Sequence, residues 1–154
     1  MKQNQLLTIA IVIIVVGILG GYYFSLKQLN DAADQMLDEV TTVSTKLENV
    51  TLLPFTGGLR ITYSIRNPAT MKIVLNMDAD LYYGDVYVGH VVSNEQVVEP
   101  ETRSDVVVKT RIEGELLKAI QQGAGKPWVL KGSMRFTGFL LNMIPITTTR
   151  TGIL

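Results

Sequence analysis

The sequence predicts an all-β domain, a seven-stranded antiparallel β-sandwich with one short helix, preceded by a transmembrane helix and a helical stalk. Three patterns of apolar and polar residues predict this architecture. An uncharged apolar stretch comes first, apolar residues then recur at alternating intervals of three and four, and apolar and polar residues alternate over the remainder. These are the patterns of a membrane-spanning helix, an amphipathic helix and half-buried strands. We therefore expect a signal anchor over residues 1–24, a stalk over 25–44 and a sheet domain over 45–154.

Composition restricts the function before any motif is considered. The chain has 154 residues, enough for one domain, and its 14 basic and 14 acidic side chains cancel, so nothing in the charge favours nucleic acid. Charged residues make up 18% of the chain, against roughly 25% in an average soluble domain, which favours a membrane segment. The sequence has no cysteine, which excludes disulfides, thiolate zinc sites and cysteine nucleophiles. We expect no cofactor and no nucleic-acid partner.

The anchor is the uncharged run from Leu6 through Ile14 to Phe24. As a helix its 19 residues would extend about 28 Å, close to the ~30 Å of a bilayer's hydrocarbon core. Tyr22 and Tyr23 lie at its far end, where membrane proteins carry an aromatic belt. The run therefore predicts a single pass through the bilayer.

A cleaved signal peptide is the alternative to an anchor. The candidate cleavage residues, Gly20 and Gly21, each have a large aliphatic residue at the minus-three position, which favours an uncleaved anchor. Lys2 and the α-amino group precede the run, whereas Lys27 and then four acidic residues follow it. This bias predicts a cytoplasmic N-terminus and a β-domain outside the cytoplasm, at the cell membrane.

Two features could bring copies of the helix together. Gly17 and Gly21 form a G-x-x-x-G pair, which lets two membrane helices approach closely. Heptad-like spacing continues beyond the membrane at Leu26, Leu29, Ala33, Met36, Val40, Val43, Leu47 and Val50. Two interpretations stay open: a single helix that continues from the membrane or lies on its own domain, and a stalk that associates into a homo-oligomer through Gly17, Gly21, Leu26, Leu29, Met36 and Val40.

Alternating residues predict the strands of the sheet domain. Gly84 and Asp85 form a hairpin turn between the third and fourth strands, and Gly89 indicates a bulge or a close backbone approach. A polar connection is expected over residues 93–105, and "GELLKAIQQGAG" predicts the short helix, ended by Gly123 and Gly125. The seven expected strands cover residues 46–54, 59–65, 71–83, 86–93, 106–112, 128–138 and 143–152.

Asn67 and Pro68 interrupt the alternation between the second and third strands. Proline has no N–H and biases the residue before it toward an extended conformation, so it does not belong in the middle of a paired strand. The asparagine side chain can bond nearby backbone groups. We expect a corner between two long strands.

This order of elements resembles a known family. A strand that ends in Asn67 and Pro68, then "LYYGDVYVGH", "VVVKTRI", a Leu-rich helix, "VLKGSMRF" and "PITTTRTG" is similar to the late embryogenesis abundant type 2 domain. That domain is also called the water-stress and hypersensitive-response domain. The likeness covers roughly Thr45 to Gly152, and its most specific parts are the corner and a hairpin with Tyr83, Gly84, Val88 and Gly89.

The resemblance implies a seven-stranded, one-helix sandwich akin to fibronectin type III and immunoglobulin domains. It also implies a non-enzymatic protein associated with desiccation or other stress, sometimes membrane-anchored. The family has no established catalytic residues, so none is transferred to this chain.

His90 and three carboxylates are the candidates for a metal site. One imidazole without a partner cluster does not make a zinc site. Asp78, Asp80 and Asp85 could gather around a hard cation, but strand positions on a solvated face are also where charges discourage edge aggregation. We expect no metal.

Two further segments carry weaker signals. Asn49, Val50 and Thr51 fit an N-glycosylation acceptor. The apolar run Phe139 to Pro145 predicts a packed segment between the last two strands, or alternatively an exposed patch that meets a protein or lipid partner.

Three functions follow from these features. The first is a membrane-tethered, non-enzymatic stress protein that binds or shields other molecules outside the cytoplasm. The second is a structural subunit of a pilus-like filament assembled through the N-terminal helix, although no basic-Gly cleavage site precedes that helix. The third is a sandwich that binds lipid in a groove. An enzyme is disfavoured because no nucleophile–base or carboxylate pair stands out.

Overall fold

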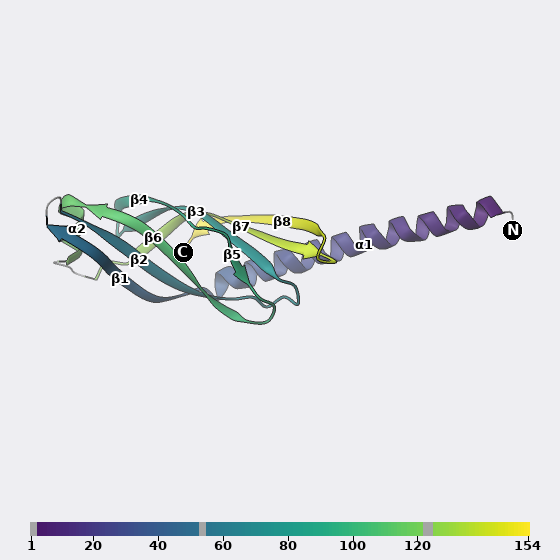
Figure 1. Ribbon diagram of the computed structural model, residues 1–154, viewed down its shortest axis with the longest axis horizontal. Helices are drawn as coiled ribbons and strands as arrows, with labels where there is room; N and C mark the ends of the chain where they lie inside the picture. The colour runs from purple at the N-terminus through teal and green to yellow at the C-terminus, as the bar shows by residue number, and fades with distance from the viewer. Residues whose placement is uncertain (1–2, 53–54, 122–124) are drawn as a thin grey trace.

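The computed structural model describes residues 3–52, 55–121 and 125–154. These residues form two antiparallel sheets, an N-terminal helix and one short helix (Figure 1). The elements, in order, are α1 (Gln3–Asp38), β1 (Thr41–Leu52), β2 (Phe55–Arg66), β3 (Ile73–Tyr83), β4 (Val86–Val92), β5 (Gln96–Val98), β6 (Arg103–Glu113), α2 (Gly114–Gln121), β7 (Trp128–Leu140) and β8 (Ile144–Ile153).

The two sheets face each other as a sandwich. One sheet has the order β1-β2-β6, and the other has the order β4-β3-β7-β8 with β5 paired to β3. In β3 the residues from Ile73 to Tyr83 alternate between buried and more exposed positions, as its sequence predicts. Burying every second side chain of each sheet produces one shared core, and the predicted sandwich is confirmed at this level.

The number of strands differs from the prediction. The described residues form eight strands, and the additional one is β5, which lies inside the segment expected to be a polar connection. Its three residues pair with the start of β3, and Val98 is completely buried. So short a strand leaves no periodic signal in the sequence. The helix at Gly114–Gln121 is confirmed, with Leu117 buried; predicted terminator Gly123 lies outside the described residues.

The boundary between helix and sheet is also earlier than predicted. The stalk was expected to reach residue 44, but α1 ends at Asp38 and β1 begins at Thr41. The residues from Thr41 to Thr45 are threonine, valine and serine, and β-branched side chains favour strands over helices. The apolar spacing that continues through Val43 therefore belongs to a strand.

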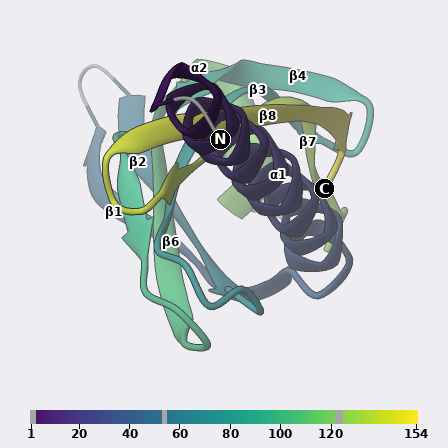
Figure 2. The ribbon, with the colours of Figure 1, turned by 90° about the vertical axis from the view of Figure 1, so that its right-hand side faces the viewer.

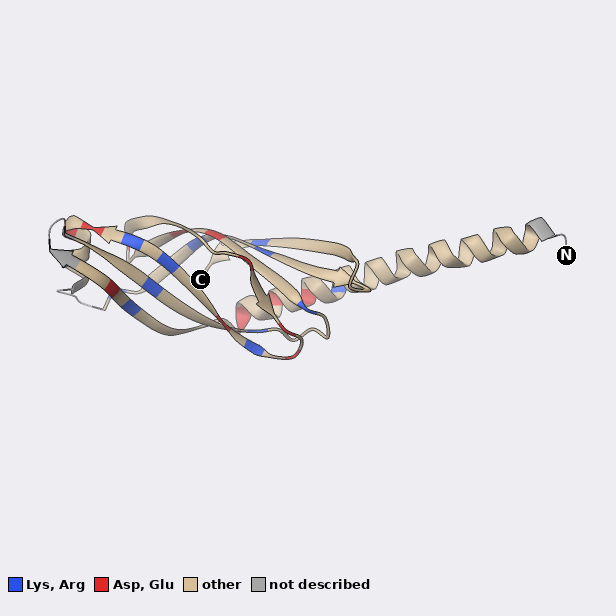
Figure 3. Cartoon of the chain, viewed as in Figure 1, with Lys and Arg blue, Asp and Glu red and all other residues tan. Residues whose placement is uncertain are grey.

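α1 is one continuous helix that runs from the predicted anchor into the predicted stalk as far as Asp38. At about 1.5 Å per residue, its 36 residues extend roughly 54 Å. It is long and apolar enough to cross a membrane. Its N-terminal half projects beyond the sandwich, and no charged residue occurs between Lys2 and Lys27 (Figures 1 and 3).

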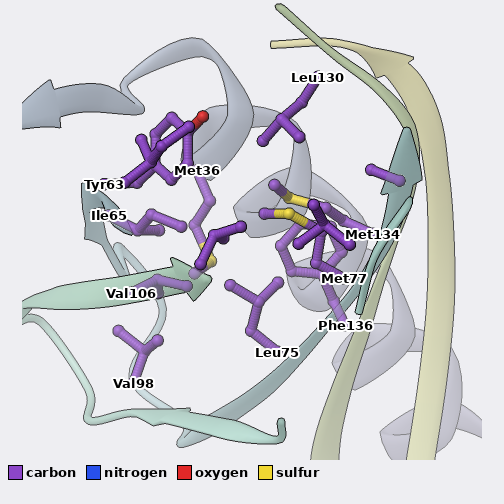
Figure 4. Packing of buried hydrophobic residues seen from close by; sticks show 14 of the residues in the cluster. Met36, Tyr63, Ile65, Leu75, Met77, Val98, Val106, Leu130, Met134 and Phe136 are labelled. Atoms are coloured by element: carbon purple, nitrogen blue, oxygen red, sulfur yellow. The ribbon is translucent and has the colours of Figure 1, made fainter. Parts of the chain in front are cut away.

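The C-terminal half of α1 fills one open side of the sandwich. Along one side β6 contacts β4 and β5, so the sheets meet there. Along the other side α1 packs on β7 and β8 and reaches β2 (Figure 2). Its buried side chains are Leu29, Ala32, Ala33 and Met36. Figure 4 shows Met36 among residues of both sheets.

The apolar stripe of α1 thus has a partner within its own chain. Leu29 and Met36 are 0% and 1% exposed, so they are not available to a second copy. Leu26 is half-buried, and Val40 lies beyond the helix end, also half-buried. Of the two interpretations of the spacing, a helix lying on its own domain agrees with the structure, and the predicted intermolecular contact through Leu29 and Met36 is wrong.

Candidate membrane-facing site

The candidate site is the end of the sandwich from which the exposed half of α1 projects. Leu6, Ile14 and Phe24, which were predicted to anchor the chain, are 57%, 60% and 68% exposed. Tyr22 and Tyr23 are exposed where this apolar surface ends. In water so large an apolar surface would be costly, which indicates an apolar surrounding.

The two glycines of the G-x-x-x-G pair have different surroundings. Gly17 has open space where a Cβ would lie. A Cβ on Gly21 would lie 3.8 Å from Cδ1 of Leu140, at the end of β7. The β7–β8 hairpin therefore covers Gly21, and only the Gly17 side of the pair faces away from the chain's own domain.

The turn of the β7–β8 hairpin carries the apolar run that was expected to be packed. Leu141 and Met143 are 79% and 84% exposed, so the alternative, an exposed patch, is correct. Leu141 and Asn142 have φ of 52° and 56°, and the N–H of Met143 donates to the carbonyl oxygen of Leu140 at 3.1 Å. Because Leu140 pairs with Ile144, the turn consists of three residues, Leu141, Asn142 and Met143.

A polar cluster fastens α1 to β8. Nε of Arg150 donates to Oδ1 of Asp34, and Nη2 donates to Oδ2 of Asp34 at 3.3 Å. Nη2 also donates to Oδ1 of Asn30 at 3.1 Å, and Thr148 donates to the same oxygen. The hydrogen bond from Arg150 lowers the pKa of Asp34, and the same bond raises the pKa of Arg150.

Nothing in the sequence pointed to this cluster. Arg150 and Asp34 are 116 positions apart, and single charged residues have no periodic signal. A smaller contact lies nearby, where Nε2 of Gln28 donates to Oγ1 of Thr70 at 2.9 Å. The first contact joins α1 to β8 and the second joins it to the connection between β2 and β3, both just beyond the apolar half of the helix.

The predicted corner at Asn67 is confirmed, since β2 ends at Arg66 and β3 begins at Ile73. Asn67 is completely buried. Its Nδ2 donates to the carbonyl oxygens of Met71 at 2.9 Å and Val98 at 3.1 Å, and its Oδ1 accepts from the N–H of Ala69 at 2.9 Å. The side chain therefore holds the corner together and ties it to β5.

Pro68 follows at a half-buried position beside α1. Together with Ala69 it lines a shallow cleft against Phe24, Gln28 and other residues of the helix. The corner thus belongs to the same end of the molecule as the β7–β8 turn.

The predicted hairpin with Tyr83, Gly84 and Gly89 lies at the other end. Gly84 has φ of 61°, a conformation that favours glycine. The β3–β4 register shifts next to Gly89, and a Cβ there would lie 3.3 Å from Oγ1 of Thr110. Of the two alternatives, the bulge is confirmed, whereas the atom near Gly89 belongs to a side chain and not to the backbone. The ring of Tyr83 packs against Trp128, with centroids 4.8 Å apart.

His90 on β4 lies beside two of the candidate metal-site carboxylates, Asp78 and Asp80 on β3. Nδ1 of His90 lies 3.0 Å from Oδ1 of Asp80, and Nε2 lies 3.4 Å from Oδ1 of Asp78. Over the described ranges, no group of three or more His, Cys, Asp or Glu side chains is placed to hold a metal ion. Asp78, Asp80 and Asp85 therefore do not gather as a cation site would require.

Asn49 lies on β1 where the strand's register with β2 shifts. It is exposed and has φ of 52°, a conformation that asparagine tolerates better than most residues. Its glycosylation stays a prediction.

The fold and this site define a class of protein: a β-sandwich mounted on a long, apolar N-terminal helix. No family model matches the chain, and no curated protein matches it. Among solved structures, the chain is similar to one described as a crystal structure of a protein from Archaeoglobus fulgidus. That match has a TM-score of 0.40 and 15% sequence identity, and covers 74% of this chain and 96% of that chain.

Proposed function

We propose that the protein is a single-pass, membrane-anchored, non-enzymatic β-sandwich that acts outside the cytoplasm in binding or protection under stress. One observation carries the anchoring: α1 runs without a break from an exposed apolar half into the hydrophobic core. A helix that is exposed at Ile14 and completely buried at Leu29 joins two environments, a bilayer and a protein interior.

The anchoring is rigid because α1 is part of the fold. Leu29 and Met36 belong to the core, and Arg150 holds Asp34 on the outside of the same helix. A sandwich on a flexible linker would sample many orientations, whereas this one keeps a single orientation relative to the helix axis. The β7–β8 turn then faces the bilayer, and the β3–β4 hairpin and α2 face away from it.

The anchor is tested by placing a charge in the span. Ile14→Arg should cost about 3 kcal/mol of insertion free energy, as expected for arginine near the centre of a membrane helix. The variant should shift from the carbonate-washed membrane fraction to the soluble or aggregated fraction. Val97→Arg, at an exposed position on β5, is the matched control and should stay in the membrane. Retention of both variants would contradict the anchor.

The orientation is tested by cysteine accessibility. The chain has no cysteine, so Val86→Cys, at an exposed position in the β3–β4 hairpin, would be the single thiol. Because the charge bias predicts that this hairpin lies outside, a membrane-impermeant maleimide should label it in intact cells. Labelling that occurs only after lysis would reverse the orientation.

The stress role rests on the resemblance to the late embryogenesis abundant type 2 domain. We treat β5 of this chain as a short strand added to the seven that the resemblance implies. Enzymes dried in the presence of vesicles that carry the full-length protein should keep more activity than enzymes dried with empty vesicles. Cells that lack the protein should survive drying less well. Equal results in both comparisons would refute a protective role.

A filament or complex built through α1 is the second candidate. The observation that favours it is the open face at Gly17, which allows close approach of another helix. Light scattering of the full-length protein in detergent would show an oligomer that Gly17→Leu disrupts. A monomer at all concentrations would refute this candidate.

A further inference from the structure

The β7–β8 hairpin has an unusual composition for an exposed element. The 14 residues from Phe136 to Thr149 include no charged side chain, and charge resumes only at Arg135 and Arg150 on its two strands. In Figure 3 the turn end of the hairpin is tan, the colour of uncharged residues, and blue residues occur only farther back along its strands. Hairpin turns exposed to water are usually polar, and this one ends in Leu141 and Met143.

The position of the hairpin is set by its contact with α1. Leu140 lies against Gly21, and the hairpin points toward the apolar half of the helix (Figure 1). Gly21 is three residues inside the end of the uncharged run at Phe24, which at ~1.5 Å per residue is about 4–5 Å. Tyr22 marks the same level on the helix. The turn therefore lies where the apolar core of a bilayer would begin.

The conformation of the turn also argues for an apolar environment. Glycine adopts a left-handed backbone conformation freely, and asparagine tolerates it better than most residues. Leu141 also has this conformation, although its φ of 52° is strained for a residue with a Cβ. In water the exposed leucine would gain nothing to offset this strain. A surrounding lipid phase would bury its side chain.

We infer that the β7–β8 turn is a second membrane contact, with Leu141 and Met143 inserted among the acyl chains beside α1. The inference rests on the proposed function, because it requires α1 to span the bilayer. Lipid is the occupant because the turn continues the uncharged surface of the helix at the same level, with Gly21 and Leu140 in contact. Two attachment points then fix the rotation of the sandwich about the helix axis as well as its distance from the surface.

Single cysteines carrying an environment-sensitive fluorophore test the insertion in vesicles that contain brominated lipid. Full-length Leu141→Cys and Met143→Cys are the test positions, and Ile14→Cys in the span reports on the anchor itself. Val86→Cys is the matched control, since it is also an exposed apolar residue in a hairpin. Val86 pairs with Tyr83, which pairs with Trp128 at the start of β7. Leu140 is twelve residues farther along β7, so the control position lies about 40 Å from the turn.

The expected result is lipid quenching and a blue-shifted emission at positions 14, 141 and 143, and neither effect at 86. Quenching at 14 without quenching at 141 and 143 would overturn the inserted turn and leave the anchor standing. No quenching at 14 would overturn the anchor, and the inference with it. A blue-shifted emission at 141 that brominated lipid does not quench would show that protein, including a second copy, covers the turn. That result would overturn the lipid contact.

Leu141→Gly separates insertion from a structural role of the side chain. Glycine adopts positive φ without strain, so the variant should fold at least as well as the parent in detergent. It also removes the apolar side chain, so a label at Met143 should be quenched less in the Leu141→Gly background. Unchanged quenching at Met143 would show that Leu141 does not hold the turn in the bilayer, contrary to the inference.

Discussion

Replacing Asn67 by alanine should destabilise the sandwich by about 3–5 kcal/mol. The side chain is completely buried and makes three hydrogen bonds to the backbone, with Met71, Val98 and Ala69. Each such bond contributes roughly 1 kcal/mol net, which gives about 3 kcal/mol for the three. The upper figure of about 5 kcal/mol includes the cost of leaving two carbonyls and one N–H without these partners in the interior.

Asn67→Asp is a sharper test because it keeps the volume and the acceptor but replaces both donors. A carboxylate there would face the carbonyl oxygens of Met71 and Val98, so burial and repulsion should raise its pKa above the ordinary value near 3.9. A folded-state pKa above the unfolded one means that stability falls as pH rises through the folded pKa. The variant should therefore be least impaired at acid pH and progressively weaker toward neutrality.

Urea unfolding of the full-length protein in detergent measures both effects. Trp128 is the only tryptophan and provides the fluorescence signal, with circular dichroism as a second probe. Asn94→Ala, at an exposed position between β4 and β5, is the matched control and should change the free energy of unfolding by about 0.5 kcal/mol or less. A loss below about 1 kcal/mol for Asn67→Ala would refute the assigned role.

Two further predictions concern packing and charge. Gly132→Ala should cost about 3 kcal/mol, because its Cβ would lie within 2.6 Å of three atoms of the neighbouring strand β3. Gly152→Ala, on the residue paired with Gly132 across β7 and β8, has open space and should be nearly neutral in the same unfolding assay. Asp34→Asn should reduce stability at neutral pH, because it removes an ionised carboxylate whose pKa is lowered by the hydrogen bond from Arg150. Since that contribution is lost as pH falls through the lowered pKa, the unfolding curves of variant and parent should converge in acid, and a constant gap would contradict the ion pair.

Several parts of the fold follow from local sequence. The alternation from Ile73 to Tyr83 predicts a half-buried strand because side chains on a strand point to opposite faces in turn. Asn67 and Pro68 predict a corner because proline cannot donate in a ladder. The uncharged run through Ile14 and the helix around Leu117 are equally local signals. In each case a few neighbouring residues determine the backbone conformation.

Other parts depend on contacts between distant residues. β5 is too short to leave a pattern, and it forms because Ile73 and Val98 meet across the sheet. Arg150 and Asp34 are brought together only by the packing of α1 on β8. The sequence of the apolar run around Leu141 does not distinguish a buried segment from an exposed one. The turn that exposes Leu141 is visible only in the fold.

Apart from β5 and the start of β1, the sequence by itself determined which segments are helix and strand, and which face of each is apolar. Only the tertiary structure decided what covers those faces. The spacing of Leu29 and Met36 suits a second helix and a β-sandwich equally well, and the structure places the sandwich there. The physical reason is that hydrophobic burial has no direction: periodicity reports that a surface must leave water, and any apolar surface of matching shape can cover it.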